Sequence, residues 1–332
     1  MRLFLLTAAT VFLASAFDID RVAPTPITAA DRVSDLVAQA RKALGGEDKV
    51  AAVKALGVTG AFRRSMGDRQ MEGTSDILIV RPDRMRRSEE MTMGGMIGGP
   101  TVERISVLSG TDAWDDVQNR GGGGGGMRIE MRMGPGGPGG PGGPGGPGGA
   151  DRQPPTEEQM REVRVRRMKT EMLRWTVALL VESPQGFVDG GVAESPDGKA
   201  DILETKDDGG RSVQLFLDQA THRPLMIQYQ ETRPRIMMAG GPGGRRGPDG
   251  AGGTPPSREE MQKRMEEMRL NPPPPATFAM HFDDYRKVDG VLLPHKIDTA
   301  IDGEPNEELT IEKYKVNPTV KPADFEKPKK TQ

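Results

Sequence analysis

Alternating apolar and polar positions run through much of the chain and predict short β-strands. Leu215 and Leu217 alternate with Gln214 and Phe216. After a turn, Leu225, Ile227 and Tyr229 alternate with their neighbours in the same way. About a dozen such segments follow one another, joined by short Gly, Asp and Asn turns. Sequential strands with short turns favour an antiparallel sheet.

Helical periodicity occurs in only a few places. Thr28–Leu44 carries one apolar stripe and stops at Gly45-Gly46. A longer helix begins after Thr156, where Gln159 completes a capping box, and extends to about Val181. Helices that only precede and interrupt a series of strands indicate an α+β fold.

Two Gly/Pro-rich inserts, 118–155 and 237–276, divide the pattern. The first contains six glycines at Gly121–Gly126 and repeated Gly-Pro-Gly triplets at Gly134–Gly148. The second ends in four consecutive prolines. Such sequence buries too little apolar area to offset its ordering entropy, so both inserts are expected to be disordered. The domain organisation is then one domain over 28–325, interrupted twice, with a tail at 326–332.

The first sixteen residues read as a signal peptide, 1–16. Arg2 precedes a short apolar stretch, and Ala14-Ser15-Ala16 forms a cleavage site that makes Phe17 the first mature residue, after Ala16. The stretch is shorter than the roughly 20 residues that span a bilayer. The expected location is periplasmic or secreted. The 332 residues include no cysteine, so stability outside the cytoplasm must come from burial.

Composition and motifs argue against several function classes. Lys and Arg number 46 against 48 Asp and Glu, a balance that provides no large field for nucleic acid. No nucleophile elbow, zinc-protease helix or phosphate-binding loop is present. We therefore expect no enzyme, catalytic residue, metal or cofactor, although triads assembled from distant positions escape such a search.

Two chemically suggestive groups have plainer explanations. His281 lies near Asp283 and Asp284, but one histidine with ordinary carboxylates is a weak metal signal, and a surface or core histidine is preferred. The adjacent carboxylates Asp115-Asp116 and Asp207-Asp208 are expected to be solvated turn residues. Neighbouring strand positions would also point them to opposite faces.

The long helix, 156–182, is rich in Arg and Lys on one side and in Met, Trp and Leu on the other. This pattern suits peripheral contact with an anionic membrane, but a solvated charged face is the commoner explanation of such a helix. Both interpretations stay open.

Four short motifs resemble the outer-membrane lipoprotein-sorting (LolA-like) family of exported bacterial proteins. They are the turn Asp218–Leu225, the segment Asp284–His295, the closing pair Asn317-Pro318 with Asp324-Phe325, and Gly110–Trp114. The resemblance extends from roughly Thr28 to Phe325 without the inserts.

The resemblance implies a curved antiparallel sheet, a half-barrel of about 11–12 strands covered by helices. Its concave side would hold a lipid or a lipoprotein acyl chain. Family carriers hold the lid with a specific arginine, for which no position is assigned here. The candidate lining residues are Val58, Phe62, Ile77, Ile79, Trp175, Leu179, Leu215, Leu217, Leu225, Ile227, Tyr229, Phe278, Met280, Phe282, Leu309 and Ile311.

Alternation alone does not distinguish a hollow pocket from a filled core. A hollow interior favours a non-enzymatic binding protein for an apolar ligand. A filled interior favours an envelope interaction or sensing scaffold, whose Gly/Pro/Met-rich inserts contact a protein partner.

Overall fold

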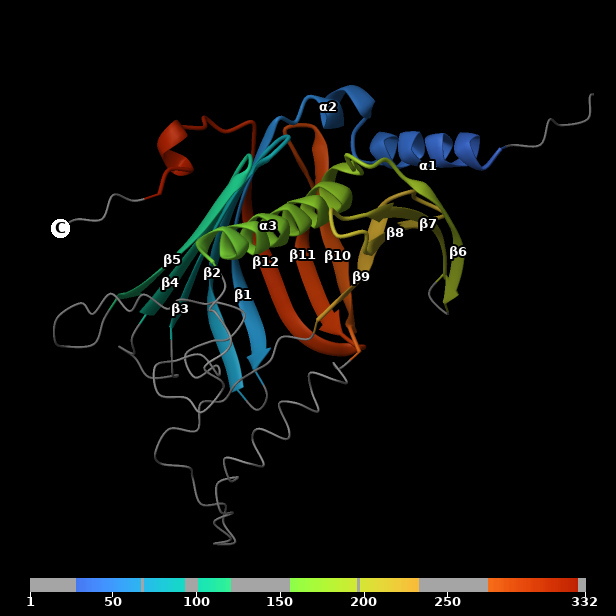
Figure 1. Ribbon diagram of the computed structural model, residues 1–332. Coiled ribbons are helices and arrows are strands. Elements are labelled where there is room, and N and C mark those ends of the chain that lie inside the picture. Colours follow the sequence, from blue (N-terminus) through green and yellow to red (C-terminus); the bar gives the residue numbers. More distant parts are fainter. Residues whose placement is uncertain are drawn as a thin grey trace, which may run out of the picture.

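The computed structural model describes residues 28–66, 69–92, 101–120, 156–195, 198–232 and 274–327. Within these residues, twelve strands form one antiparallel sheet, which curves around a long helix (Figure 1). The strand order is β5-β4-β3-β2-β1-β12-β11-β10-β9-β8-β7-β6. The predicted α+β fold with an antiparallel, helix-covered sheet is therefore confirmed. The described sheet is open, because β5 and β6 each pair with a single neighbour.

Most strands are eight residues or longer, and most consecutive strands are separated by only a few residues. Their bounds are β1 Ala55–Met66, β2 Arg69–Val80, β3 Arg84–Thr92, β4 Thr101–Ser109, β5 Asp112–Arg120, β6 Val188–Ser195, β7 Gly198–Lys206, β8 Ser212–Asp218, β9 Pro224–Glu231, β10 Ala276–Val288, β11 Val291–Ile301 and β12 Glu304–Val316.

The helices begin and end where the capping signals place them. α1 (Ala29–Ala43) starts at the N-cap Thr28, whose hydroxyl accepts from the backbone N–H of Asp31 in a capping box. α2 (Glu47–Ala51) follows directly. α3 (Glu157–Leu180) starts at Thr156 in a second capping box and ends at Val181, which adopts a left-handed conformation. A short 3-10 helix, Pro322–Asp324, closes the described chain.

The close of α1 shows why two consecutive glycines stand there. A Cβ on Gly45 would lie 2.3 Å from the carbonyl oxygen of Gly290 in the β10–β11 turn, and its φ is +126°. The backbone N–H of Leu292 donates to the carbonyl of Leu44 at 2.7 Å. The C-terminal end of α1 is thus hydrogen-bonded directly to the β10–β11 hairpin.

Apolar side chains pack on both faces of the sheet. The larger cluster lies on the concave face beneath α3. On the convex face of β2–β5, a smaller cluster contains Trp114 and Phe325, and the Trp114 indole donates to the Phe325 carbonyl at 3.1 Å. The C-terminal segment therefore covers the outer face of this half of the sheet.

The three longest connections leave from one rim of the sheet. In the antiparallel register, Thr92 pairs with Thr101, Thr101 with Arg120, and Glu231 with Ala276. The chain departs after Thr92, Arg120 and Glu231, so all three departures lie at the same strand ends. β5 and β10 take up residues 118–120 and 276 of the predicted inserts. Residues 121–155 of the first insert, 237–273 of the second insert and the signal peptide lie outside the described residues, so their predicted properties stay predictions.

Candidate functional site: the concave face beneath α3

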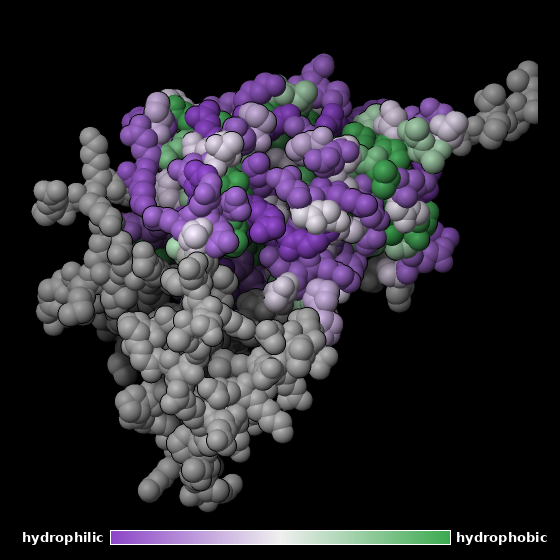
Figure 2. Space-filling view, in the orientation of Figure 1, coloured by the Kyte–Doolittle hydropathy of each residue, from purple (hydrophilic) through white to green (hydrophobic). Residues whose placement is uncertain are grey.

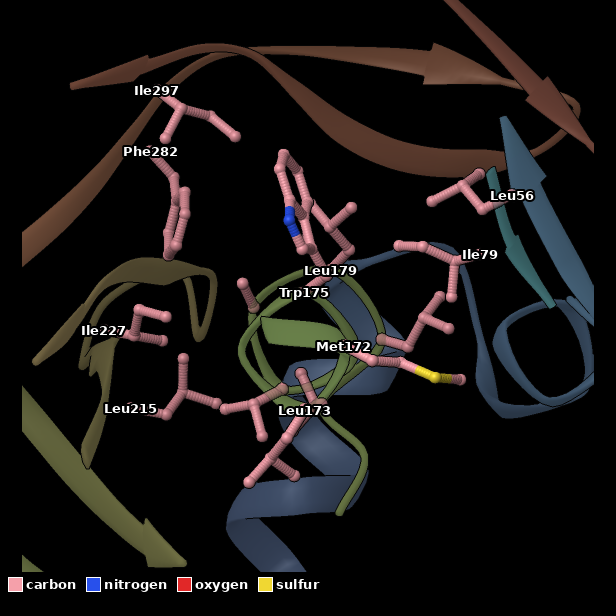
Figure 3. Packing of buried hydrophobic residues seen from close by; sticks show 14 of the residues in the cluster. Leu56, Ile79, Met172, Leu173, Trp175, Leu179, Leu215, Ile227, Phe282 and Ile297 are labelled. Atoms are coloured by element: carbon pink, nitrogen blue, oxygen red, sulfur yellow. The ribbon is translucent and has the colours of Figure 1, made fainter. Parts of the chain in front are cut away.

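The second half of α3 fills the concave side of the sheet. Ten of its residues are buried, among them Met172, Leu173, Trp175 and Leu179. In Figure 3, Trp175 projects between the strand that carries Ile297 and the side of Leu56 and Ile79, while Leu173 points toward Leu215. The helix thus supplies the apolar contents of the half-barrel as well as its cover.

Most of the candidate lining residues belong to the buried cluster beneath α3. Trp175 and Leu179 come from α3, and Met280 is partly buried against the same cluster. The strand residues in the cluster are Val58, Phe62, Ile77, Ile79, Leu215, Leu217, Ile227, Tyr229, Phe278, Phe282, Leu309 and Ile311.

Leu225 is the exception, with 41% of its surface exposed. The pairing of β8 with β9 shifts at Phe216 and Leu217, so that Leu217 pairs with Pro224 and Phe216 with Met226. Leu225 is the extra residue of this bulge and has no partner in the β8 register. A bulge shifts the alternation of buried and exposed positions by one residue, and the position of a bulge cannot be read from the sequence pattern of one strand.

The space left between α3 and the sheet is small. A cavity of about 10 Å³ lies between α3 and the ends of β1 and β2, lined by residues that include Leu56, Ile79, Trp175 and Leu179. A volume of this size holds about one water molecule. In this arrangement of the helix, the cavity does not accommodate a hydrocarbon chain.

The other half of the concave face is charged. Arg64 of β1 donates to Glu89 at 2.8 Å and to Glu307 at 2.5 Å. Arg87 of β3 donates to Glu89 at 2.6 Å and to Glu171 of α3 at 2.6 Å. We call these five residues the concave ion network. It connects β1, β3, β12 and α3 near the rim from which the long connections leave.

Glu89 is the centre of this network, and its side chain is 8% exposed. Burial disfavours its ionised form, but the charges of Arg87 and Arg64 outweigh that effect and lower the pKa of Glu89 to about 2. Burial likewise opposes ionisation of Arg87, whose pKa is nevertheless raised by Glu171 and Glu89. Glu89 and Arg87 are therefore both ionised across the neutral range.

Ion pairs also attach α3 to the margins of the sheet. Arg167 donates to Asp115 at 2.6 Å, and Arg174 donates to Glu231 at 2.7 Å. Arg164 donates to the backbone carbonyl of Ala113 on the edge strand β5 at 3.1 Å. Several of the cations that make the helix basic therefore face the sheet.

The sequence interpretation missed this network. Asp115 was expected in a solvated turn, yet it lies within β5 and accepts from Ser106 as well as Arg167. Asp207 does lie in a turn, but it is buried, with its carboxylate bound to Arg211 and to the hydroxyl of Thr170. One sequence signal could have indicated the network. Arg87 and Glu89 of β3 alternate with their neighbours in phase with the buried Met85, so the two charges lie on the apolar face of the strand.

A second helix is fastened at the other end of the sheet. Arg32 of α1 donates to Asp189 of β6 at 2.7 Å and to Asp201 of β7 at 2.8 Å. The hydrogen bonds that Arg32 donates to Asp201 and Asp189 raise the pKa of its guanidinium above the ordinary value. Figure 2 shows hydrophobic residues gathered near α1 and β6, whereas the surface over α3 is mainly hydrophilic.

The described residues hold no group of three or more His, Asp or Glu side chains placed to bind a metal ion. His281 is exposed on β10, and Asp284 is paired with Arg286 instead. None of the helices within the described ranges is long and apolar enough to cross a membrane.

Comparison with known proteins gives matches by structure and none by sequence. No family model and no curated protein matches the chain. A LolA superfamily protein from Nitrosomonas europaea is 10% identical, with a TM-score of 0.43, over 89% of this chain and 97% of that one. A DUF1329 family protein from Desulfovibrio piger is 10% identical, with a TM-score of 0.40, over 89% and 97%.

A putative outer membrane lipoprotein-sorting protein domain from Vibrio parahaemolyticus is 12% identical, with a TM-score of 0.39, over 88% of this chain and 97% of that one. The functional proposal below rests on the chain's own residues.

Proposed function

We propose that this protein is a non-enzymatic binding protein of the periplasm or the extracellular space, whose concave face takes an apolar chain of a lipid or a lipoprotein. The single observation that carries the proposal is the way this face is filled. One helix, α3, occupies an open curved sheet with its own apolar side chains. The polar contacts that hold the helix are side-chain bonds at its margins, such as Arg167 with Asp115.

Binding requires α3 to move, because the cavity of about 10 Å³ is too small for a chain. An acyl chain of about sixteen carbons gains about 0.8 kcal/mol per buried methylene, or roughly 13 kcal/mol in all. Exposing Met172, Leu173 and Leu179 costs about 1.5–3 kcal/mol each, or roughly 5–9 kcal/mol together. A limited shift of the helix is therefore within the free energy that such a ligand supplies.

The test is to fix α3 to the sheet. The chain has no cysteine, so Arg167→Cys with Asp115→Cys introduces one reactive pair, which a short bismaleimide joins at the place of the native ion pair. We expect the unlinked double variant to take up a fluorescent fatty acid and the linked protein to lose that uptake. Arg63→Cys with Glu72→Cys, an exposed cross-strand pair of β1 and β2, is the matched control and should bind in both states.

Native mass spectrometry of gently purified protein gives an independent readout. Protein that is consistently free of ligand and also ignores fatty-acid probes rejects the proposal. Equal uptake by the linked and unlinked α3 variants rejects the movement of α3.

A second candidate function is favoured by the filled interior itself. With a cavity of about 10 Å³, the described domain also suits a rigid scaffold that contacts an envelope protein through its inserts. Deleting 121–149 separates the two candidates. Loss of a partner in pull-down experiments with unchanged lipid binding favours the scaffold, and the reverse favours the binding protein.

A further inference from the structure

Arg104 differs from the other arginines beneath α3. It lies on β4, on the same face as Ser106 and the fully buried Leu108. In the sheet register it stands opposite Glu89 of β3 and Val117 of β5. Yet, within the part of the chain that the structure describes, its guanidinium makes no hydrogen bond and no ion pair.

The neighbouring carboxylates are already bound to other arginines. Glu89 accepts from Arg64 and Arg87, and Asp115 accepts from Arg167. Burial lowers the pKa of Arg104, and the positive charge of Arg167 lowers it further, against the opposing effect of Asp115 and Glu89. A guanidinium carries five N–H donors, and those of Arg104 have no partner among the described residues.

An oxyanion satisfies this arrangement best. A carboxylate or a phosphate accepts two parallel N–H bonds from a guanidinium and so pairs with donors that have no partner within the described chain. A neutral ligand group accepts weaker bonds from the same donors. The unpaired donors therefore select for the chemistry of the ligand's polar end.

The distance from Arg104 to the apolar part of the concave face is comparable to the length of an acyl chain. Leu108 is four positions further along the same strand face, which corresponds to about 13 Å at 3.3 Å per residue. Leu108 belongs to the same buried cluster as Met85 of β3 and Met168 of α3. A chain whose head is at Arg104 would thus run directly into the apolar interior.

We propose that Arg104 binds the oxyanion head, carboxylate or phosphate, of an amphiphile whose apolar chain occupies the concave face beneath α3. This inference rests on the proposed function and specifies its ligand class. The polar end of the site would then lie at the rim of the sheet where the three long connections begin.

Calorimetric titration at pH 8 with decanoate, decyl phosphate and decanol, which share one chain, tests the proposal. We expect the wild-type protein to prefer both oxyanions to decanol. Arg104→Gln should weaken oxyanion binding by about 10- to 100-fold, as expected for hydrogen bonds to a charged group, and leave decanol within about threefold. Arg86→Gln, a β3 arginine in register with Leu78 and 3.7 Å from Asp76, is the matched control and should change neither.

The outcomes separate this inference from the proposed function. Equal binding of decanoate and decanol by the wild-type protein overturns the Arg104 site and leaves chain binding intact. Arg104-dependent binding of inorganic phosphate or acetate without any chain binding supports the oxyanion site and rejects the chain function. Binding of none of the probes overturns both. Arg104→Lys, which keeps the charge, should restore part of the preference, and the wild-type preference decides the matter even where a variant does not fold.

Discussion

The guanidinium of Arg174 on α3 lies 3.5 Å from the centre of the Tyr229 ring on β9. Tyr229 stacks in turn on Phe278 of β10, with ring centres 5.3 Å apart, and Arg174 also donates to Glu231. One helical side chain thus joins a cation–π contact and an ion pair at the edge of the apolar core. This is the best candidate for a contact that keeps α3 closed on this side of the sheet.

Arg174→Met removes the charge and keeps a long apolar side chain on the ring. We expect a loss of about 1–3 kcal/mol of unfolding free energy, from the cation–π contact and the charged hydrogen bond. Urea titration measures it. Arg161→Met, an exposed substitution on the same helix, is the control and should stay within about 0.5 kcal/mol of the wild type.

The same substitution tests the movement of α3. If the contacts of Arg174 hold α3 closed and so oppose ligand entry, weakening them favours the state that binds. Each 1.4 kcal/mol by which the closed state alone is destabilised then tightens apparent fatty-acid binding by up to about tenfold. Weaker binding by Arg174→Met, in a protein that remains folded, contradicts a closing role for this contact.

Acid should release the concave ion network. The pKa of Glu89 is about 2 in the folded protein against 4.5 ordinarily. Its contribution to stability, about 3 kcal/mol, is therefore fully present above the ordinary pKa and is lost as the pH falls through the folded one. The free energy of unfolding, measured at a series of pH values from 6 to 2, should therefore decrease below about pH 4.5.

Glu89→Gln should be less stable at neutral pH and show a shallower fall over the same pH range. Glu72→Gln, at an exposed ion pair on β2, is the control and should follow the wild-type curve. A Glu89→Gln curve parallel to that of the wild type would show that other carboxylates cause the acid sensitivity.

Trp175 is the largest side chain that α3 places in the interior, and it is 4% exposed. Trp175→Ala should cost about 3–5 kcal/mol, because it removes buried apolar area and leaves a cavity. Such an apolar cavity binds small hydrophobic molecules, so benzene should raise the melting temperature of the variant and not that of the wild type. Absence of stabilisation by benzene would show that the surrounding side chains collapse into the space.

The two glycines that end α1 provide a matched pair. Both have positive φ, +126° at Gly45 and +112° at Gly46, so alanine is strained at either position. Only at Gly45 would the new Cβ meet a backbone atom, the carbonyl oxygen of Gly290 at 2.3 Å. Gly45→Ala should therefore destabilise the protein by clearly more than the 1–3 kcal/mol or so of backbone strain expected for Gly46→Ala. Equal melting temperatures for the two variants would rule out the close approach.

Local signals in the sequence predicted the elements themselves. The capping boxes at Thr28 and Thr156 and the alternation through β8 act between near neighbours, and the structure follows them. Where a long-range register intervenes, local prediction failed. The bulge that exposes Leu225 is a property of the pairing of two strands and not of either strand alone.

The sequence by itself determined that an antiparallel sheet with one apolar face would be covered by helices, because periodicity and capping are local and the uncovered face is unstable in water. Only the tertiary structure decided what lies on that face. It brought Arg64, Arg87, Glu89, Glu171 and Glu307 together from positions up to 243 residues apart, and it left Arg104 beside them without a hydrogen-bonded partner among the described residues. Ion pairing and filling of the interior depend on which side chains meet across the fold, and no pattern along the chain records those meetings.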